Sequence, residues 1–216
     1  MQIEGVCGPQ FVSDSASSAV RLGKNGALIV SEYHGKYYEA AYRGLEGQEP
    51  GIFHATNPGL LALAGPAATA TSFALANPLN SGRNLVLHKV RVALTTLPGT
   101  LVAGAFALYG NPVPNATAVT GTSITPINGA LGAGSKPAGN AFYTATLPVA
   151  PSLIIPIGGK ISATEFGGIS NGLLEEDLDG SLILSPGTYL TVQETVGDTT
   201  TNFSAVVSMS WEEVAA

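Results

Sequence analysis

The clearest alternation of apolar and polar residues lies in the last third of the chain. Leu190, Val192 and Val196 alternate with polar neighbours, and residues 203–211 do so more strictly. A period of two is typical of strands that bury one face. Between these runs lies the polar segment 197–202, which contains Gly, Asp and Asn and predicts a turn. We therefore expect an antiparallel hairpin that closes the core of a β-sandwich.

The longest strand predicted by the pattern spans residues 84–95. Leu85 and Leu87 share one face with Lys89, whereas Val90 falls on the opposite face together with His88. This conflict of register predicts either a β-bulge or a strand that is buried on both sides.

Shorter β-signals, separated by Pro- and Gly-rich turns, recur along the same region. They cover residues 67–76, 101–109, 116–119, 123–127, 141–147, 152–157, 160–164 and 182–184. Residues 128–140 predict a loop, and residues 166–180 predict a turn-rich acidic connection. Eight to ten short strands without intervening helices predict an all-β fold, a single jelly-roll β-sandwich over residues 58–216.

Residues 1–57 have a different character. They hold four of the seven tyrosines and include only two short elements, a strand over 27–33 and a helix over 36–43. We expect an extended N-terminal arm rather than a second domain. Tyrosines provide large contact areas at low entropic cost, so they either dock the arm on a partner or cap the open end of the sandwich.

Composition and charge narrow the possible partners. Only 11% of the residues are charged, and the net charge is −6 without a cluster of bases, which argues against a nucleic-acid partner. The apolar stretch 60–76 is interrupted by Gly, Pro and Thr, which argues against a membrane. The N-terminus lacks the features of a secretory signal, so we expect synthesis in a cytoplasm. A weakly charged surface costs little to desolvate, as is typical of chains that pack against copies of themselves.

The search for catalytic or metal-binding chemistry predicts neither enzyme activity nor a cofactor nor a bound metal. The three histidines, His34, His54 and His88, have no metal-ligand spacing. A lone Cys7 near the terminus is more typical of an incidental thiol than of a nucleophile. No nucleophile elbow, phosphate-binding loop or paired-cysteine motif is present.

One acidic cluster offers oxygen ligands for a hard cation. It comprises Glu175, Glu176, Asp177 and Asp179. Consecutive acids break the order of a calcium loop, so the cluster is interpreted either as a solvated turn or as a cation site.

Three stretches carry a resemblance to a known class of proteins. They are YYEAAYRG with IFHATNPG in the N-terminal region, NPLNSGRNLVLHKVRVAL, and the closing GSLILSPGTYLTVQETVG followed by FSAVVSMSWEE. Together they resemble the minor structural, or cement, proteins of tailed bacteriophages. The closing pair also resembles the trimeric jelly rolls of the tumour-necrosis-factor and C1q type.

The resemblance implies a virion protein that decorates the outside of a capsid as a homotrimer and bridges major capsid subunits. In that role the arm would contact the shell through Tyr37, Tyr38, Tyr42 and Phe53 as aromatic anchors, with Arg43 as a charged partner.

Two rival roles use the same fold. A tail-fibre or receptor-binding module would contact a host glycan through apical loops such as 128–140. A major capsid jelly roll would need a basic arm or interior face for the genome, and the acidic balance argues against this role.

Overall fold

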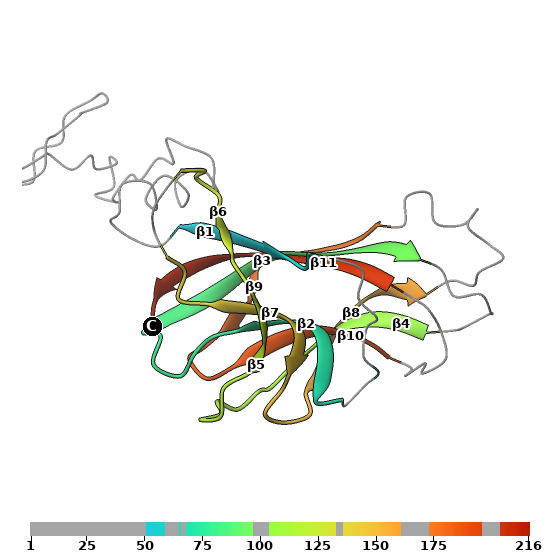
Figure 1. Cartoon of the computed structure of the whole chain (residues 1–216), viewed down its shortest axis with the longest axis horizontal. Helices are drawn as coiled ribbons and strands as arrows, with labels where there is room; N and C mark the ends of the chain where they lie inside the picture. The colour runs from blue at the N-terminus through green and yellow to red at the C-terminus, as the bar shows by residue number, and fades with distance from the viewer. Residues whose placement is uncertain are drawn as a thin grey trace, which may run out of the picture. The chain divides into compact units, whose positions relative to one another are not determined.

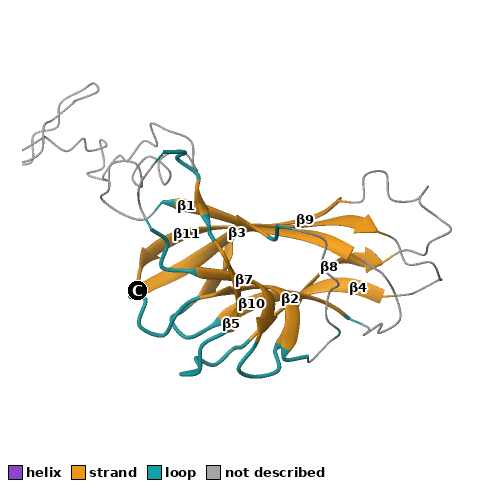
Figure 2. Cartoon of the chain, in the orientation of Figure 1, coloured by secondary structure: helices purple, strands orange, loops and turns teal. Residues whose placement is uncertain are grey.

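The computed structural model describes residues 51–58, 65, 68–96, 104–132, 136–160, 173–195 and 204–216. The chain divides into two compact units, residues 1–39 and 40–216, and every described residue belongs to the second. The described residues form strands joined by turns and loops, and no helix appears among them (Figure 2). The described part therefore contains no helix that is long and apolar enough to cross a membrane.

The strands form two antiparallel sheets, which Figure 1 shows as two layers. The first sheet has the order β6 (Ile127–Asn128), β1 (Ile52–Thr56), β11 (Ser204–Ala215), β3 (Arg83–Thr96) and β9 (Leu173–Leu184). The second has the order β5 (Thr120–Ile124), β7 (Asn140–Thr146), β2 (Ala70–Ala76), β10 (Tyr189–Glu194), β4 (Gly104–Gly110) and β8 (Ser152–Lys160).

The strand order confirms the predicted all-β jelly-roll sandwich. Strands β1, β11, β3 and β9 are neighbours in one sheet, and β2, β10, β4 and β8 occupy the corresponding positions in the other. The chain passes from one sheet to the other between β1 and β2, β2 and β3, and β3 and β4, and again between β8, β9, β10 and β11. This wrapping is that of an eight-stranded jelly roll. Strands β5, β6 and β7 form an insertion between β4 and β8, and they extend both sheets on the side of β1 and β2.

The predicted closing hairpin is wrong. The two alternating runs become β10 and β11, which lie in opposite sheets: β10 pairs with β2 and β4, whereas β11 pairs with β1 and β3. Alternation indicates that a strand has one buried face, but it does not identify the strand that pairs with it. In addition, β10 is buried along its entire length.

The hydrophobic core lies between the two sheets and receives side chains from both. Phe53 and Trp211 are completely buried in the first sheet, and their ring centroids are 6.0 Å apart. Phe73 and Phe106 reach the same core from the second sheet. Because Phe53 comes from β1, the sandwich already begins at Ile52, within the segment that the sequence assigns to the arm.

The predicted register conflict in the longest strand is resolved by a β-bulge, which confirms the first of the two alternatives. Trp211 pairs with Leu87 and Ser210 pairs with Lys89, so His88 is an extra residue on β3. On the other side of β3, Leu87 pairs with Leu182 and Lys89 with Asp177, which leaves residues 178–181 of β9 opposite His88. Asp179 and Gly180 have positive φ values of 45° and 80° in this irregular stretch.

Three other local expectations need correction. Residues 173–180 are not a turn-rich connection, because they form the first part of β9, and residues 173–177 pair with β3. Residues 116–119 are not a strand. The run expected at 152–157 belongs to a longer strand, β8, which continues to Lys160, and residues 161–164 of the next expected run lie outside the described residues. The strand expected at 27–33 and the helix expected at 36–43 lie outside the described residues.

The outermost strands of both sheets are irregular or short. Pairing of β8 with β4 shifts register twice, and Pro156 between these shifts has no N–H to donate. At the opposite edge of the second sheet, β5 shifts register at Gly121, whose φ is 153°. In the first sheet, the edge strand β6 has only two residues, and the other edge strand, β9, contains the irregular stretch 178–181, which does not pair with β3. Such features hinder the addition of a further strand.

A single buried carboxylate attaches the loop before β7 to the last strand. The side chain of Glu213 on β11 is 1% exposed. It accepts hydrogen bonds from the backbone N–H of Ala138, at 2.8 and 3.0 Å, and of Gly139, at 2.9 Å. The indole N–H of Trp211 donates to the same carboxylate at 3.1 Å. Glu213 therefore links the core, the last strand and the loop.

Candidate functional site

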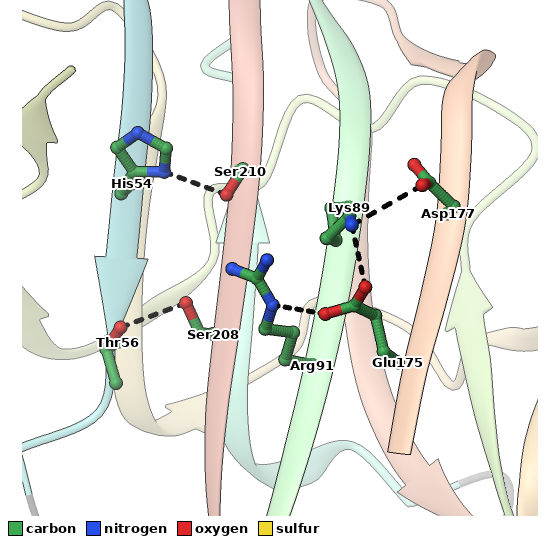
Figure 3. Close-up of polar contacts among 8 residues, drawn as sticks. All are labelled: His54, Thr56, Lys89, Arg91, Glu175, Asp177, Ser208 and Ser210. Atoms are coloured by element: carbon green, nitrogen blue, oxygen red, sulfur yellow. Dashed lines mark hydrogen bonds and ion pairs between the residues drawn. The ribbon is translucent and has the colours of Figure 1, made fainter. Parts of the chain in front are cut away.

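Polar side chains form a row across the outer face of the first sheet, over β1, β11, β3 and β9 (Figure 3). We call this set the polar row; it consists of His54, Thr56, Lys89, Arg91, Glu175, Asp177, Ser208 and Ser210, with His88 and Glu212 beside it. These residues occupy the positions that alternate with core residues, so the same period of two that builds the core also builds the row.

At the β1 end of the polar row, side chains pair across neighbouring strands. His54 Nδ1 lies 2.8 Å from Ser210 Oγ, and the Thr56 hydroxyl donates to Ser208 Oγ at 3.0 Å. Both contacts join residues that face each other in the register of β1 and β11. Such cross-strand pairs contribute to sheet stability.

The bulge in β3 brings a second histidine to this face. His88 is 7% exposed, and its Nε2 lies 3.6 Å from a carboxylate oxygen of Glu212. Since β11 separates β1 from β3, Ser210 and Glu212 lie between the two histidines. His54 and His88 are therefore close enough to influence one another electrostatically.

The β9 end of the polar row is a network of ion pairs. Glu175 accepts a hydrogen bond from Lys89 Nζ at 2.7 Å and from Arg91 Nε at 2.6 Å, and Lys89 also lies 3.4 Å from Asp177. The hydrogen bonds from Lys89 and Arg91 lower the pKa of Glu175, and the bond to Glu175 raises the pKa of Lys89. All of these side chains are at least partly exposed, so solvent screens the network.

In the described part of the chain the acidic cluster matches neither of its two interpretations, because its members lie on a strand and two of them form ion pairs. Glu175 and Asp177 face the bases of β3, whereas Glu176, which comes between them on the strand, points to the other side of the sheet. Among the described residues, no group of three or more His, Cys, Asp or Glu is placed to hold a metal ion. Residues 175–179 belong to strand β9, and residues 175–177 pair with β3, so the cluster is not a solvated turn.

The polar row contains a serine and a histidine in contact, Ser210 and His54. A serine–histidine pair needs a third group that orients the imidazole and stabilises its charge. The hydrogen-bond partner of His54 among the described residues is Ser210, and the other ring nitrogen lies beside Gly129. Of the charges that act on His54, that of Arg91 has the largest effect, and a cation opposes protonation of the imidazole.

The protonation of His54 gives a testable consequence. Burial, followed by the positive charge of Arg91 and the neighbouring His88, lowers the pKa of His54 below its ordinary 6.5. The folded state therefore disfavours the charged imidazole, and stability should fall as the pH drops from 6.5 towards the lower pKa of the folded state. An NMR titration should place the His54 midpoint below 6.5, and Arg91→Ala should raise it. An unchanged midpoint in that variant would contradict the role of Arg91.

Of the residues that the sequence nominated for partner binding, only Phe53 lies among the described residues. Tyr37, Tyr38, Tyr42 and Arg43 lie outside the described residues. Phe53 is 0% exposed and packs against Trp211, so its side chain belongs to the core and cannot contact a partner on the outer surface.

The structure also assigns roles that the sequence did not indicate. His54 and Ser210 are 156 residues apart in the chain, and Glu213 is about 75 residues from the loop that it holds. The only signal available was that Ser210 and Glu212 occupy polar positions of an alternating strand.

Comparisons with known proteins do not identify the chain. No family model matches it. No curated protein matches it either. A solved structure titled "KBV activated particle at acidic pH" aligns over 98% of this chain and 86% of that chain, with 11% sequence identity and a TM-score of 0.24. A TM-score this low does not establish a common fold, so the jelly-roll assignment depends on strand topology alone.

Proposed function

We propose that this chain is a structural protein of a virus particle, and specifically a decoration protein that binds the outside of a tailed-bacteriophage capsid as a homotrimer. The sequence resemblance suggests this role, and a jelly roll is a fold that capsid proteins use. Because one fold serves many functions, the proposal needs support from the surface as well.

The observation that carries the proposal is the exposure of large apolar side chains on a weakly charged surface. Nine of them are at least 40% exposed among the described residues: Leu79, Val113, Ile127, Leu131, Val149, Leu153, Ile154, Leu173 and Ile183. Single exposed apolar residues are ordinary, but here they occur in a chain of which only 11% of the residues are charged. Such a surface loses little hydration free energy when a protein partner covers it.

A trimer on a shell would gain retention from several modest contacts. Once one subunit is bound, the others meet their sites at a high effective concentration, so the overall affinity exceeds that of each contact. The N-terminal segment with Tyr37, Tyr38, Tyr42 and Arg43 would supply one contact per subunit. The polar row offers a second surface, because its hydroxyl, imidazole and charged groups can exchange internal bonds for bonds to a partner.

The first measurement is the copy number of this chain relative to the main shell protein in purified particles from its source. A count in the hundreds, in a fixed ratio to the shell protein, would support decoration. A few copies per particle would instead support a tail-fibre or receptor-binding module. Absence from particles would refute any virion role.

Removal of residues 1–50 should abolish particle binding while the jelly roll stays folded and trimeric. The truncation must end there, because β1 begins at Ile52 and pairs with β11 along its whole length. Binding would be measured by co-sedimentation with particles that lack this chain. Circular dichroism and light scattering would report fold and oligomer.

A variant that keeps the backbone provides the matched control. Tyr37, Tyr38 and Tyr42 would be replaced together by alanine, which removes the proposed anchors but not the segment. If the truncated chain still bound the particles at full occupancy, the role of the arm would be refuted. If the truncated chain lost particle binding but the triple alanine variant kept it, residues of the arm other than these tyrosines would make the contact.

A further inference from the structure

A pocket of about 100 Å³ opens at the end of the sandwich where β2 ends and β7 and β10 begin. Its walls come from four separate parts of the chain: the turn after β2, residues 115–119, the start of β7 and the turn before β10. None of the residues that line it is charged. It lies away from the polar row, since β2, β7 and β10 all belong to the second sheet.

Hydrogen bonds hold the walls of this pocket in place. The side-chain oxygen of Asn111 accepts a hydrogen bond from the backbone N–H of Tyr189 at 2.7 Å. The side-chain NH₂ of Asn111 donates a hydrogen bond to the backbone carbonyl of Val113 at 2.9 Å. The backbone N–H of Asn115 donates to the carbonyl of Gly187 at 2.9 Å. The pocket is therefore formed before any ligand arrives, which reduces the entropic cost of binding.

Gly187 allows the walls to approach closely. Its φ is 84°, and a Cβ added there would lie 2.9 Å from Leu79 Cδ1 and 3.1 Å from Pro114 Cβ. Only glycine adopts this backbone conformation without strain and leaves this space. Gly187 therefore lets the turn before β10 pack against Leu79 and Pro114.

The lining combines neutral polar groups with apolar surface. The side-chain oxygen Oδ1 of Asn115 accepts a hydrogen bond from the backbone N–H of Thr117 at 2.8 Å, which leaves the side-chain NH₂ as a donor. Asn140 and Thr117 are exposed at the pocket and offer a second amide and a hydroxyl. Leu79 is 46% exposed and Phe142 is partly exposed, so carbon surface lies beside these polar groups.

We propose that this pocket binds one neutral sugar residue at the end of a glycan. Amides bind pairs of sugar hydroxyls because they both donate and accept, and the C–H face of a sugar ring packs on apolar and aromatic side chains. A phosphate, a carboxylate or an ammonium group would find no opposite charge among the lining residues. The size of the pocket fits one residue rather than a longer segment. This inference is independent of the proposed structural role.

Saturation-transfer NMR with the full chain tests the proposal. The probes are glucose, galactose, mannose, N-acetylglucosamine and N-acetylgalactosamine, each at up to about 50 mM, with sialic acid as a charged control. At least one neutral sugar should bind with a Kd of about 1 to 10 mM, since so small a ligand meets few polar groups. Sialic acid should not bind.

Substitutions at the pocket locate the binding. Ala118 is exposed on the wall, so Ala118→Trp should fill the pocket without disturbing the core, and Asn140→Ala removes one amide. Each of these two variants should raise the Kd of the sugar about tenfold or more, because one loses the space of the pocket and the other loses a polar contact. Thr122→Ala on β5, also exposed but outside the pocket, is the matched control and should bind as the unaltered chain does.

The results separate this inference from the structural role. Absence of binding by every neutral sugar, or equal binding by the Ala118→Trp variant with its fold intact, would overturn it. Neither result would alter the copy number in particles, and a failed decoration role would leave sugar binding unchanged.

Discussion

Replacement of Trp211 by alanine is expected to lower the free energy of unfolding by about 4 kcal/mol, in the middle of the range for a buried aromatic residue. The side chain is completely buried, and its ring packs against Phe53. It lies on β11, which has neighbours on both sides, so the surrounding backbone has little freedom to close the cavity. Denaturation in urea would give the free energy difference.

Two further variants make this test specific. Trp211→Phe keeps most of the buried carbon surface but removes the N–H donor to Glu213. It should therefore lower the free energy of unfolding by about half as much as Trp211→Ala does. Val206→Ala on the same strand truncates a partly exposed residue and should cost about 1 kcal/mol or less. Equal losses for Trp211→Ala and Val206→Ala would contradict a central role for the indole.

Replacement of Glu213 by alanine is expected to cost about 3 kcal/mol, because it removes the acceptor for three buried or partly buried N–H groups at once. The loop at residues 136–139 should then detach from β11. Hydrogen exchange would show this directly, as the amides of Ala138 and Gly139 should exchange much faster than those of the sheet.

Neighbouring and conservative variants are the controls for Glu213. Glu213→Gln keeps the shape and one acceptor oxygen, so it should lose less stability than the alanine variant. Glu212→Ala changes the adjacent residue, which is partly exposed on the opposite face, and should leave the exchange of Ala138 and Gly139 unaltered. Slow exchange of both amides in Glu213→Ala would refute the proposed attachment.

The periodic pattern of the sequence was sufficient for the fold class but not for the pairing of strands. Residues 203–211 alternate clearly, and those from Ser204 onward form the first part of β11. Their neighbour in sequence, β10, shows a similar alternation, yet it lies in the other sheet and is buried on both faces. In a jelly roll each strand pairs mostly with strands distant in the chain, and local patterning contains no information about such partners.

The polar row was unpredictable for a related reason. Its contacts depend on register, and register depends on the bulge that places His88 and Lys89 on the same face. The sequence did predict an irregularity in that strand, from the conflict between Leu87 and Val90. It did not predict that residues 173–177 would form a paired strand, because consecutive acids are common in turns.

The irregular outer strands have a consequence for how the molecule can associate. With Pro156 and two register shifts on β8, and a strand of only two residues at β6, these two edges offer no straight row of free backbone groups within the described residues. Copies at high concentration should therefore not template one another into fibres. Association is left to side chains, which substitution can alter one at a time, so assembly can evolve separately from the fold.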